Sequence, residues 1–274
     1  MKSANAPIVY YQYTSGQIES IRSDVIVETP VSLTVNGEHW LTFMCTPVHL
    51  EAMAVGFLFN EGLIESIDEI ADVRLCAAGD NVDIWTYLPL VKPEQWRRTT
   101  GCTGGMTSVG FHHQGEHHSN GGTLPAHSIA ELVAQLFESQ ELYRTSGGVH
   151  TSALSDGSRI VISAEDIGRH NTLDKLAGRL LLEMIHLPRK IILSTGRISS
   201  EMLQKSDRMG VSIVISRTSP SSLSIELAET LDITLIGYAR RNRFNIYTHP
   251  QRVILPSMSD IVSKDELNTP ENVT

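Results

Sequence analysis

Long apolar runs are absent from this 274-residue sequence. Stretches such as "AVGFLF" are far shorter than the ~20 residues that a membrane-spanning helix needs. The first residues, "MKSANAPIVYYQYTSG", carry one lysine with no apolar segment after it, so no secretory signal is predicted. Glycine and proline, at 20 and 11 residues, are too few for a fibrous or disordered chain. We therefore expect a cytoplasmic protein with a hydrophobic core and no membrane segment.

Cysteine is also scarce, with three residues and no Cys-x-x-Cys pair. The odd number and the spacing argue against a disulfide framework and against a four-cysteine zinc site. Cys45 and Cys76 stand in apolar runs and are predicted to be small buried residues. Cys102 differs, because "RRTTGCTGGMTSVG" surrounds it with glycine and threonine. It is either a small residue of a surface loop or an exposed nucleophile.

Positive charge is in deficit, and the formal net charge of −9 argues against general nucleic-acid binding. Arginine nevertheless supplies 16 of the 22 basic residues. Its guanidinium forms paired hydrogen bonds to phosphates and carboxylates, which lysine does not. The positions of the arginines therefore carry more information than the net charge.

The pattern along the chain divides it into four parts. Residues 1–96 are predicted to be β-rich, with hairpins at Asn36-Gly37 and around Gly79-Asp80-Asn81 and one helix over about 48–61. Residues 97–126 lack periodicity and are expected to form a mobile loop containing Cys102. Residues 127–256 alternate strands with helices, which predicts an α/β domain, and residues 257–274 form a tail.

A histidine-rich stretch, "HHQGEHHSNGG", lies in the predicted loop. Its members are His112, His113, His117 and His118. They show no established ligand spacing and have only Glu116 as a nearby carboxylate. A solvated loop is the better interpretation, and no catalytic metal is predicted.

In the α/β part, a helix over 128–140 precedes a hairpin that turns at Asp156-Gly157. The later strands are expected to pair in parallel with right-handed crossovers, so that hairpin and crossovers together make a mixed sheet with flanking helices. The helix that follows the hairpin should place Asp174 and Lys175 on its solvent face. Its expected cap is Asn171, and Ser219-Pro220 is expected to begin a later helix.

Arginines follow four successive predicted strands of this part. Arg169, Arg197 and Arg217 each stand between a strand and a helix. Arg240, Arg241 and Arg243 follow the strand "ITLIGYA". Carboxyl ends of parallel strands share one edge of a sheet, where ligands of open α/β sheets bind. Hydroxyls such as those of Ser199 and Ser219 add donors, so the pattern predicts a crevice for a phosphorylated ligand, with scattered surface arginines as the alternative.

No G-x-G-x-x-G or G-x-x-x-x-G-K-[ST] motif is present, so neither a Rossmann nor a Walker phosphate loop is predicted. The densest polar cluster is "EDIGRHN", residues 165–171, and His150 could approach it from the preceding loop. A histidine beside carboxylates can act in general acid–base chemistry. A network of salt bridges that fixes the helix entry explains the cluster equally well, and the sequence leaves both open.

Four segments together resemble the formate dehydrogenase accessory protein family, FdhD. They are "SGGVHTSAL", "EDIGRHNTLDKLAGRLL", "LSTGRISSEMLQKSDRMGVSIVISRTSPSSLSIELAE" and "LIGYARRNRFNIYTHPQRV". The resemblance extends from about residue 20 to residue 254 and is densest after residue 146.

This resemblance implies a sulfurtransferase that accepts sulfur from a cysteine desulfurase as a persulfide. The sulfur passes to the molybdenum or tungsten bis-guanine-dinucleotide cofactor, a bound substrate, before it enters formate dehydrogenase. The family also implies a cytidine deaminase-like α/β domain, a homodimer and binding of guanine nucleotides such as GDP. Its loop cysteine matches Cys102, and its cofactor-binding turn matches Tyr238, Ala239, Arg240, Arg241, Asn242 and Arg243.

One departure from the family is visible. Many members carry Cys-x-x-Cys in this loop, whereas Cys102 is followed by Thr103, Gly104 and Gly105. A persulfide needs only one accessible thiolate, so sulfur transfer remains the main hypothesis. The alternatives are a cofactor chaperone without sulfur chemistry and a nucleotide-binding regulator in which Cys102 is incidental. A zinc deaminase is rejected, because "HLE" at residues 49–51 is followed by no P-C-x-x-C motif.

Overall fold

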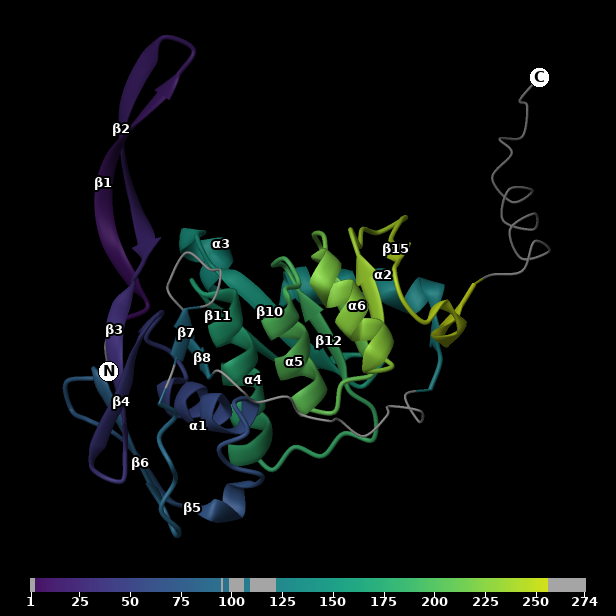
Figure 1. The fold of residues 1–274 in the computed structure, drawn as a ribbon. Helices are drawn as coiled ribbons and strands as arrows, with labels where there is room; N and C mark the ends of the chain where they lie inside the picture. The colour runs from purple at the N-terminus through teal and green to yellow at the C-terminus, as the bar shows by residue number, and fades with distance from the viewer. Residues whose placement is uncertain (1–2, 95, 99–105, 109–121, 256–274) are drawn as a thin grey trace, which may run out of the picture.

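The computed structural model describes residues 3–94, 96–98, 106–108 and 122–255. Figure 1 shows a hairpin arm standing clear of a body that is built around one six-stranded and one four-stranded sheet. The arm consists of β1 (Asn5–Thr14) and β2 (Gln17–Ile26), which pair along their whole length. The sequence indicated a β-rich beginning, but it did not indicate this arm as a separate element.

The smaller sheet has the strand order β4-β3-β6-β5. Its members are β3 (Thr29–Val35), β4 (Glu38–Cys45), β5 (Ile70–Leu75) and β6 (Asn81–Thr86). Both hairpins predicted from the sequence are confirmed, and Asn36 and Gly37 have the positive φ angles, 50° and 83°, of a tight two-residue turn. Alternate residues of β3 are buried against α1 (Leu50–Asn60), which forms the core of this lobe.

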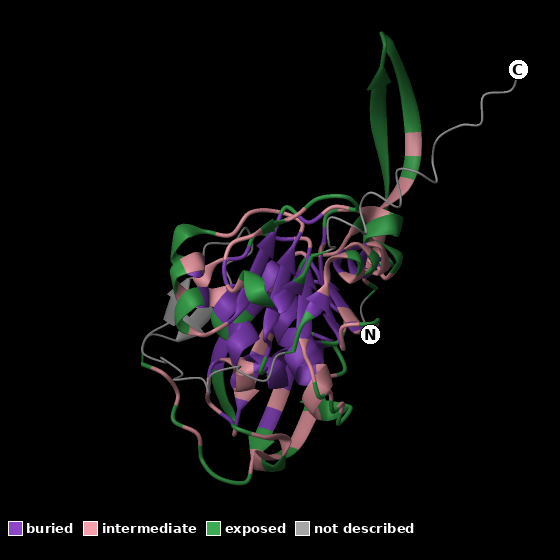
Figure 2. Cartoon of the chain, turned by 90° about the vertical axis from the view of Figure 1, so that its right-hand side faces the viewer, coloured by how far each residue is buried: buried purple, intermediate pink, exposed green. Residues whose placement is uncertain are grey.

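The larger sheet has the order β11-β10-β12-β13-β14-β15. It contains β10 (His150–Ser155), β11 (Ile160–Asp166), β12 (Ile191–Ser194), β13 (Ile213–Ser216), β14 (Thr234–Gly237) and β15 (Asn245–Ile246). Strands β12, β13 and β14 are parallel and the other pairings are antiparallel, which confirms a mixed sheet. The parallel strands are wholly buried because helices cover both faces (Figure 2).

Three helices cover one face of this sheet and one long helix covers the other. The first group is α4 (Arg169–Leu182), α5 (Ser200–Arg208) and α6 (Ser222–Thr230). Helix α2 (Ala126–Glu138) packs on the opposite face, beside a short pairing of β9 (Leu124–Pro125) with β16 (Val253–Ile254). A five-residue helix, α3 (Leu142–Ser146), follows α2, and two short 3-10 turns lie at Ile67–Glu69 and Pro250–Arg252.

The two lobes meet where α1 crosses α4. A Cβ atom placed on Gly56 would lie 1.8 Å from the Asp174 carbonyl oxygen, and one placed on Gly178 would lie 1.8 Å from that of Ala52. Both distances are far below van der Waals contact, so only glycine permits this close approach of the helix backbones. The crossing brings polar groups of both lobes into one buried interface.

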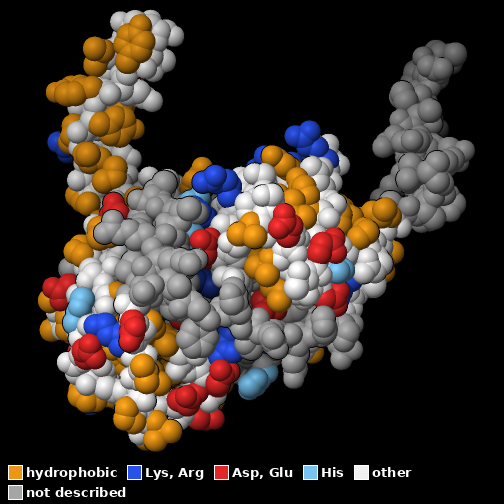
Figure 3. Space-filling model, viewed as in Figure 1, with side chains coloured by type: hydrophobic (Ala, Val, Ile, Leu, Met, Phe, Trp, Pro, Cys, Tyr) orange, Lys and Arg blue, Asp and Glu red, His pale blue; other side chains and the backbone are white. Residues whose placement is uncertain are grey.

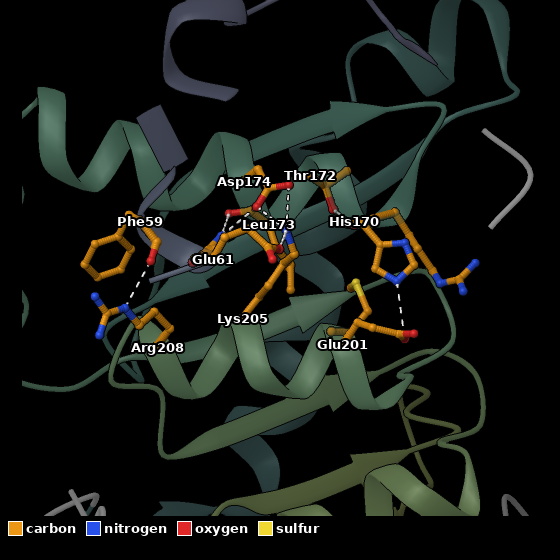
Figure 4. A network of polar contacts seen from close by, with 12 residues as sticks. Phe59, Glu61, His170, Thr172, Leu173, Asp174, Glu201, Lys205 and Arg208 are labelled. Atoms are coloured by element: carbon orange, nitrogen blue, oxygen red, sulfur yellow. Dashed lines mark hydrogen bonds and ion pairs between the residues drawn. The ribbon is translucent and has the colours of Figure 1, made fainter. Parts of the chain in front are cut away.

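Buried ion pairs occupy this interface, contrary to the expected solvent face of α4. Lys175 Nζ lies 2.6 Å from Asp166 Oδ2, and both side chains are fully buried. Lys205 Nζ lies 2.7 Å from Asp174 Oδ1 and 3.3 Å from Glu61 Oε1 (Figure 4). The hydrophobic periodicity gave the wrong prediction for this face of α4, because α1 covers it. Its charged side chains are neutralised by ion pairs instead of being hydrated.

Two predicted helix caps are wrong. Helix α4 begins at Arg169 after the N-cap Gly168, and Asn171 instead donates from Nδ2 to the Met44 carbonyl and to Asp166 Oδ1. Asp166 also accepts from Gly168 N, and the helix begins three residues earlier than expected.

Helix α6 has Ser221 as its cap, with Oγ accepting from Ser224 N. Ser219 and Pro220 are held in an extended bridge with Ile198, so the helix starts after them. The extended stretch before the Asn36-Gly37 turn is also divided, because β2 ends at Ile26 and β3 begins at Thr29.

The cysteines and the loop between the lobes bring two further corrections. Cys45 is buried as predicted, but Cys76 is half-buried and its thiol donates to Asp80 Oδ1 at 3.0 Å. The stretch expected to lack structure contains β7 (Trp96–Arg98) paired with β8 (Met106–Ser108). In the described parts of the chain, no helix is long and apolar enough to cross a membrane.

Candidate functional site

One edge of the larger sheet collects the chemistry-bearing residues. Strand β10 runs antiparallel to both β11 and β12, so β11 has the same direction as the three parallel strands. The carboxyl ends of β11, β12, β13 and β14 therefore lie along one edge, together with the amino end of β10. The arginines predicted from the sequence follow these strand ends, but the structure divides them between the two faces of the sheet.

The face covered by α2 holds a pocket of about 700 Å³. Its lining consists of Val133, Ala134, Phe137 and Glu138 from α2 together with Arg217, Arg240, Arg241, Asn242 and Arg243. This volume suits a nucleotide-sized ligand. Four guanidinium groups line this pocket, and Glu138 supplies the only carboxylate among the lining residues, so the pocket is strongly positive.

Arg217 shows this imbalance most clearly. Its Cζ atom lies 4.3 Å from the centroid of the Phe137 ring, which is the geometry of a cation–π contact. Its Nε atom is buried and has no hydrogen-bond partner. Burial lowers the pKa of Arg217, and the nearby positive charge of Arg240 lowers it further. A bound anion would supply both the hydrogen-bond acceptor and the negative charge that this side chain lacks.

The turn after β14 is held by backbone hydrogen bonds to the preceding strand end. Tyr238 N donates to the Thr218 carbonyl and Ala239 N donates to that of Ser216. The turn closes with a bond from Arg240 N to the Arg243 carbonyl at 2.8 Å. Tyr238 adopts the left-handed region with φ of 51°, a conformation that is strained for a residue with a side chain.

These bonds determine which side chains of the turn can meet a ligand. Ala239 is fully buried in the core beneath the turn, so it contributes backbone rather than side-chain contacts. Arg241, Asn242 and Arg243 are exposed at the pocket mouth, and Arg240 is held inward by a bond from Nη1 to the Arg217 carbonyl. Tyr238 is exposed but is not part of the pocket lining.

A second cluster lies on the other face, where α4 and α5 begin. His170 Nε2 lies 3.2 Å from Ser199 Oγ and 3.9 Å from Glu201 Oε2 (Figure 4). Burial lowers the pKa of His170 to about 3, with smaller contributions from Arg169, Lys205 and His150. The imidazole is therefore neutral at physiological pH. A neutral imidazole with so low a pKa is a poor general acid or base near pH 7.

Neighbouring loops complete this cluster. A Cβ atom on Gly196 would lie 3.2 Å from Arg169 Cβ and 3.3 Å from His150 Nδ1, so the glycine permits their close approach. His150, at the start of β10, therefore does approach the "EDIGRHN" segment, and its pKa is lowered by burial and then by Arg169. Arg197 is exposed in the same loop, and the carbonyl of half-buried Ser219 accepts from Ile198 N.

The carboxylates of "EDIGRHN" serve the scaffold. Glu165 accepts hydrogen bonds from the backbone N–H groups of Glu141, Leu142 and Tyr143 at 2.7–3.1 Å, which satisfies the first turn of α3. Asp166 accepts from Thr46 N at 3.0 Å and thereby ties the smaller lobe to the sheet edge. Among the residues of this motif, only Arg169 and His170 belong to the second cluster.

The four pocket residues that α2 supplies were not foreseen from the sequence. Phe137 and Glu138 end α2, whose buried residues are Ile129, Leu132, Val133 and Leu136. Phe137 lies beside this apolar stripe rather than within it, and 38% of its surface is exposed. A large aromatic residue outside the buried stripe was the one signal in the sequence that could have indicated a binding surface on α2.

Cys102 and the histidines at positions 112–118 lie outside the described residues. The described strands β7 and β8 pair from Arg98 with Met106, and Cys102 lies between these two strands in the sequence. Within the described ranges, no group of three His, Cys, Asp or Glu residues has a geometry suited to a metal ion.

Comparison with known proteins places these features in a family. The FdhD/NarQ family model matches residues 26–254, which include both clusters and the turn after β14. The chain belongs to the FdhD/NarQ family. It is 36% identical over 255 residues to the sulfur carrier protein FdhD of Bacillus pumilus (strain SAFR-032), covering 89% of this chain and 96% of that protein.

The FdhD protein of Bacillus subtilis (strain 168) is 35% identical over 253 residues, with 89% of this chain and 95% of the relative covered. A crystal structure described as a formate dehydrogenase accessory protein, from Desulfotalea psychrophila, superposes with a TM-score of 0.75. It shares 27% sequence identity and covers 92% of this chain and 100% of its own. The family resemblance inferred from the sequence motifs is thus confirmed.

Proposed function

We propose that this FdhD/NarQ protein is a sulfur carrier required for formate dehydrogenase activity. In this proposal Cys102 accepts sulfur from a cysteine desulfurase and passes it to a molybdenum or tungsten bis-guanine-dinucleotide cofactor, which is the substrate. The protein acts as a homodimer in the cytoplasm, and its larger lobe has the cytidine deaminase-like arrangement. The sulfur carrier name of the relatives and the arginine pocket support the proposal.

The observation that carries the proposal is the unsatisfied guanidinium of Arg217. Its Nε is buried without a partner and its charge is opposed by that of Arg240. A pyrophosphate group is the part of a guanine dinucleotide that would relieve both conditions, because its oxygens accept several charged hydrogen bonds at once. Arg241, Asn242 and Arg243 are exposed at the pocket mouth and, in this proposal, would bind the rest of the phosphate chain.

The α2 side of the pocket suits a base. Phe137 presents an aromatic ring and Glu138 a carboxylate beside the arginines. A carboxylate accepts hydrogen bonds from the N1–H and 2-amino groups of guanine, whereas adenine offers no such pair of donors. We expect GDP to bind more tightly than IDP, which lacks the 2-amino group, and more tightly than ADP. Isothermal titration calorimetry with the three nucleotides measures this preference.

The sulfur step requires one thiolate. The Cys102 thiolate would attack the outer sulfur of the desulfurase persulfide, forming a new S–S bond while the desulfurase thiolate leaves. Arg169, His170, Arg197, Ser199 and Ser219, at the same sheet edge, are proposed as further contacts for the cofactor on the face opposite the arginine pocket. Because His170 is neutral, it would offer a hydrogen bond rather than a charge.

A cofactor chaperone that performs no sulfur chemistry is the second candidate. The absence of a second loop cysteine, with Thr103-Gly104-Gly105 after Cys102, is the observation that favours it. This protein would then hold the guanylyl cofactor and deliver it to formate dehydrogenase unchanged.

Labelled sulfur separates the two candidates. The protein is incubated with a cysteine desulfurase and ³⁵S-labelled cysteine, and mass spectrometry compares wild type with Cys102→Ser and Cys76→Ser. Cys76 is the matched control because its thiol is half-buried and reaches a polar partner. We expect one sulfur on Cys102 in the wild type and in Cys76→Ser, and none in Cys102→Ser. Full activation of formate dehydrogenase by Cys102→Ser would instead establish the chaperone.

The pocket is tested separately with Arg240→Ala, Arg241→Ala and Arg243→Ala. Each lost charged hydrogen bond is worth about 1.5–3 kcal/mol, so each variant should bind GDP at least ~10-fold more weakly. Unchanged GDP affinity in all three would place the ligand elsewhere.

A further inference from the structure

The sequence after the last described residue is acidic. We call residues 256–274 the acidic segment; its charged residues are Asp260, Lys264, Asp265, Glu266 and Glu271. Four carboxylates and one ammonium group give it a formal net charge of −3. The FdhD/NarQ family model ends at Ile254, so the acidic segment lies outside the region that the family match defines. A receptor for this segment on the described body would have to be positively charged.

The arginine pocket on the α2 face has the complementary charge. Its charged lining residues are Arg217, Arg240, Arg241, Arg243 and Glu138. Four guanidinium groups and one carboxylate give the lining a formal net charge of +3. Figure 3 shows Lys and Arg side chains grouped on the upper edge of the larger lobe, above α6 and β15. Guanidinium groups bind carboxylates as well as phosphates, so this pocket can accept an acidic peptide.

The acidic segment begins near the helix that leads to the pocket. Ile254 pairs with Pro125, which is the N-cap residue of α2. Phe137 lies near the other end of α2, about 18 Å away at 1.5 Å per residue. Asp265 follows Leu255 by ten positions, and a chain of that length spans up to ~33 Å. The carboxylates of Asp265 and its neighbour can therefore reach the pocket with length to spare.

The surface between this starting point and the pocket is suited to an apolar stretch of chain. Ala126, Ala130 and Ala134 are half-buried and follow one another at four-residue spacing, so they form a row along α2. The last of them lines the pocket. In the acidic segment, Ile261 and Val262 precede the pair of carboxylates. The order apolar then acidic along the segment thus matches the order apolar then basic along α2.

We propose that the acidic segment binds the arginine pocket of its own chain, with Asp265 and Glu266 in the place of the phosphate groups of the ligand. Two adjacent carboxylates accept charged hydrogen bonds from several guanidinium groups at once. A segment joined to the same chain has an effective concentration on the order of 1 mM, which exceeds that of a second copy at micromolar protein.

This contact would regulate the pocket. A ligand binds more weakly in proportion to the fraction of protein in which its site is free, so the acidic segment would raise the concentration of ligand that the pocket needs. A dinucleotide with more phosphate contacts would displace the segment, whereas a weak anion would not. The inference rests on the proposed anion-binding role of the pocket and adds its regulation, and it does not depend on sulfur transfer.

The contact is measured directly by NMR on the ¹⁵N-labelled full chain. The amide shifts of Asp265 and Glu266 are compared with those of a synthetic peptide of residues 256–274. We expect different shifts in the wild type and peptide-like shifts in Arg241→Ala with Arg243→Ala. The matched control is Arg189→Ala, because Arg189 also has buried nitrogens without hydrogen-bond partners but does not line the pocket. This control should keep the wild-type shifts.

The competition is measured by calorimetry with inorganic pyrophosphate at 0.15 M salt. The segment variant, Asp265→Asn with Glu266→Gln, should bind pyrophosphate about 5- to 10-fold more tightly than the wild type, because the pocket is then free. The matched control is Glu19→Gln with Glu226→Gln, which changes the net charge equally at two exposed positions outside the pocket lining. Its affinity should equal that of the wild type, because distant charges are screened at this salt concentration.

Peptide-like shifts in the wild type, release of the segment by Arg189→Ala alone, or shifts that change with protein concentration would overturn the proposal. Equal pyrophosphate affinity in the segment variant and the wild type would also overturn it, and would leave the proposed ligand site intact. If neither protein binds pyrophosphate while the shifts still respond to Arg241 and Arg243, the segment contact holds and the proposed phosphate ligand fails. Thermal unfolding verifies that the variants fold.

Discussion

The low pKa of His170 predicts a specific loss of stability in acid. In the unfolded chain the imidazole has a pKa of 6.5, and in the folded protein burial lowers it to about 3. Between these two values the unfolded state binds more protons than the folded state. The free energy of unfolding therefore falls as the pH falls from 6.5 toward 3, and the contribution of His170 is fully present only above pH 6.5.

The magnitude follows from the shift. The full difference of 3.5 units corresponds to about 5 kcal/mol, and about 3 kcal/mol of it is lost between pH 7 and pH 4. The positive charges of Arg169 and Lys205, with His150 close by, strengthen the effect, since protonation would add a cation to a buried cationic site. The substitution His170→Gln keeps a group able to hydrogen-bond Ser199 and removes the titration.

The assay is urea unfolding of wild type and His170→Gln at several values between pH 7 and pH 4. Other groups titrate in this range, including His150, whose pKa is also lowered, but the difference between the two proteins isolates position 170. We expect the wild type to lose about 3 kcal/mol more than the variant. Equal pH dependence in the two proteins would refute the reasoning and show that His170 is hydrated or charged.

Three further predictions concern the lobe interface and the pocket. Gly178→Ala should lower the free energy of unfolding by about 2 kcal/mol or more, because the new Cβ would meet the Ala52 carbonyl of α1. This loss should exceed the gain of ~1 kcal/mol that alanine brings in helix propensity. Urea unfolding measures the difference, and an unchanged or higher free energy of unfolding would contradict the close crossing of the two helices. Lys175→Met should lower the free energy of unfolding by about 3–5 kcal/mol in the same assay, because Asp166 is left buried without its cation. Adding Asp166→Asn should restore part of this loss. Additive losses in the double variant would contradict a direct interaction between Lys175 and Asp166. Arg217→Gln should weaken pyrophosphate binding ~10-fold or more, because a charged hydrogen-bond donor is lost. The melting temperature should not fall, because the substitution relieves the repulsion between Arg217 and Arg240. Calorimetry and thermal unfolding measure the two effects, and a large drop in melting temperature would assign Arg217 to the scaffold.

Local signals in the sequence predicted the local structure well. The Asn36-Gly37 turn and the alternation of strands with helices gave hairpins, crossovers and a mixed sheet, because turn chemistry and hydrophobic period act over a few residues. The position of Arg217 and Arg240 at strand ends likewise predicted that these two side chains lie close together, since parallel strands bring their ends to one edge.

Features that depend on distant packing escaped the sequence. The periodicity of α4 placed Asp174 and Lys175 in solvent, but their partners Asn60, Thr46 and Lys205 come from other elements. The sequence also could not assign each arginine to one face of the sheet, because the end of a strand does not determine on which side of the sheet the following side chains lie. The aromatic wall of the pocket came from α2, which precedes the sheet in the chain.

The buried pairs between the lobes have a consequence for synthesis of the chain. Lys175 binds the Thr46 carbonyl, 129 residues earlier in the sequence. At roughly 5–20 residues per second, a ribosome needs on the order of 10 s to make that intervening stretch. During this interval the smaller lobe has left the ribosome, but α4 has not yet been made. The surface of α1 around Gly56 and the carboxylate of Glu61 are therefore still uncovered. Nascent chains of this protein therefore have a defined period in which a chaperone that shields α1 would protect them, and slower translation would lengthen it.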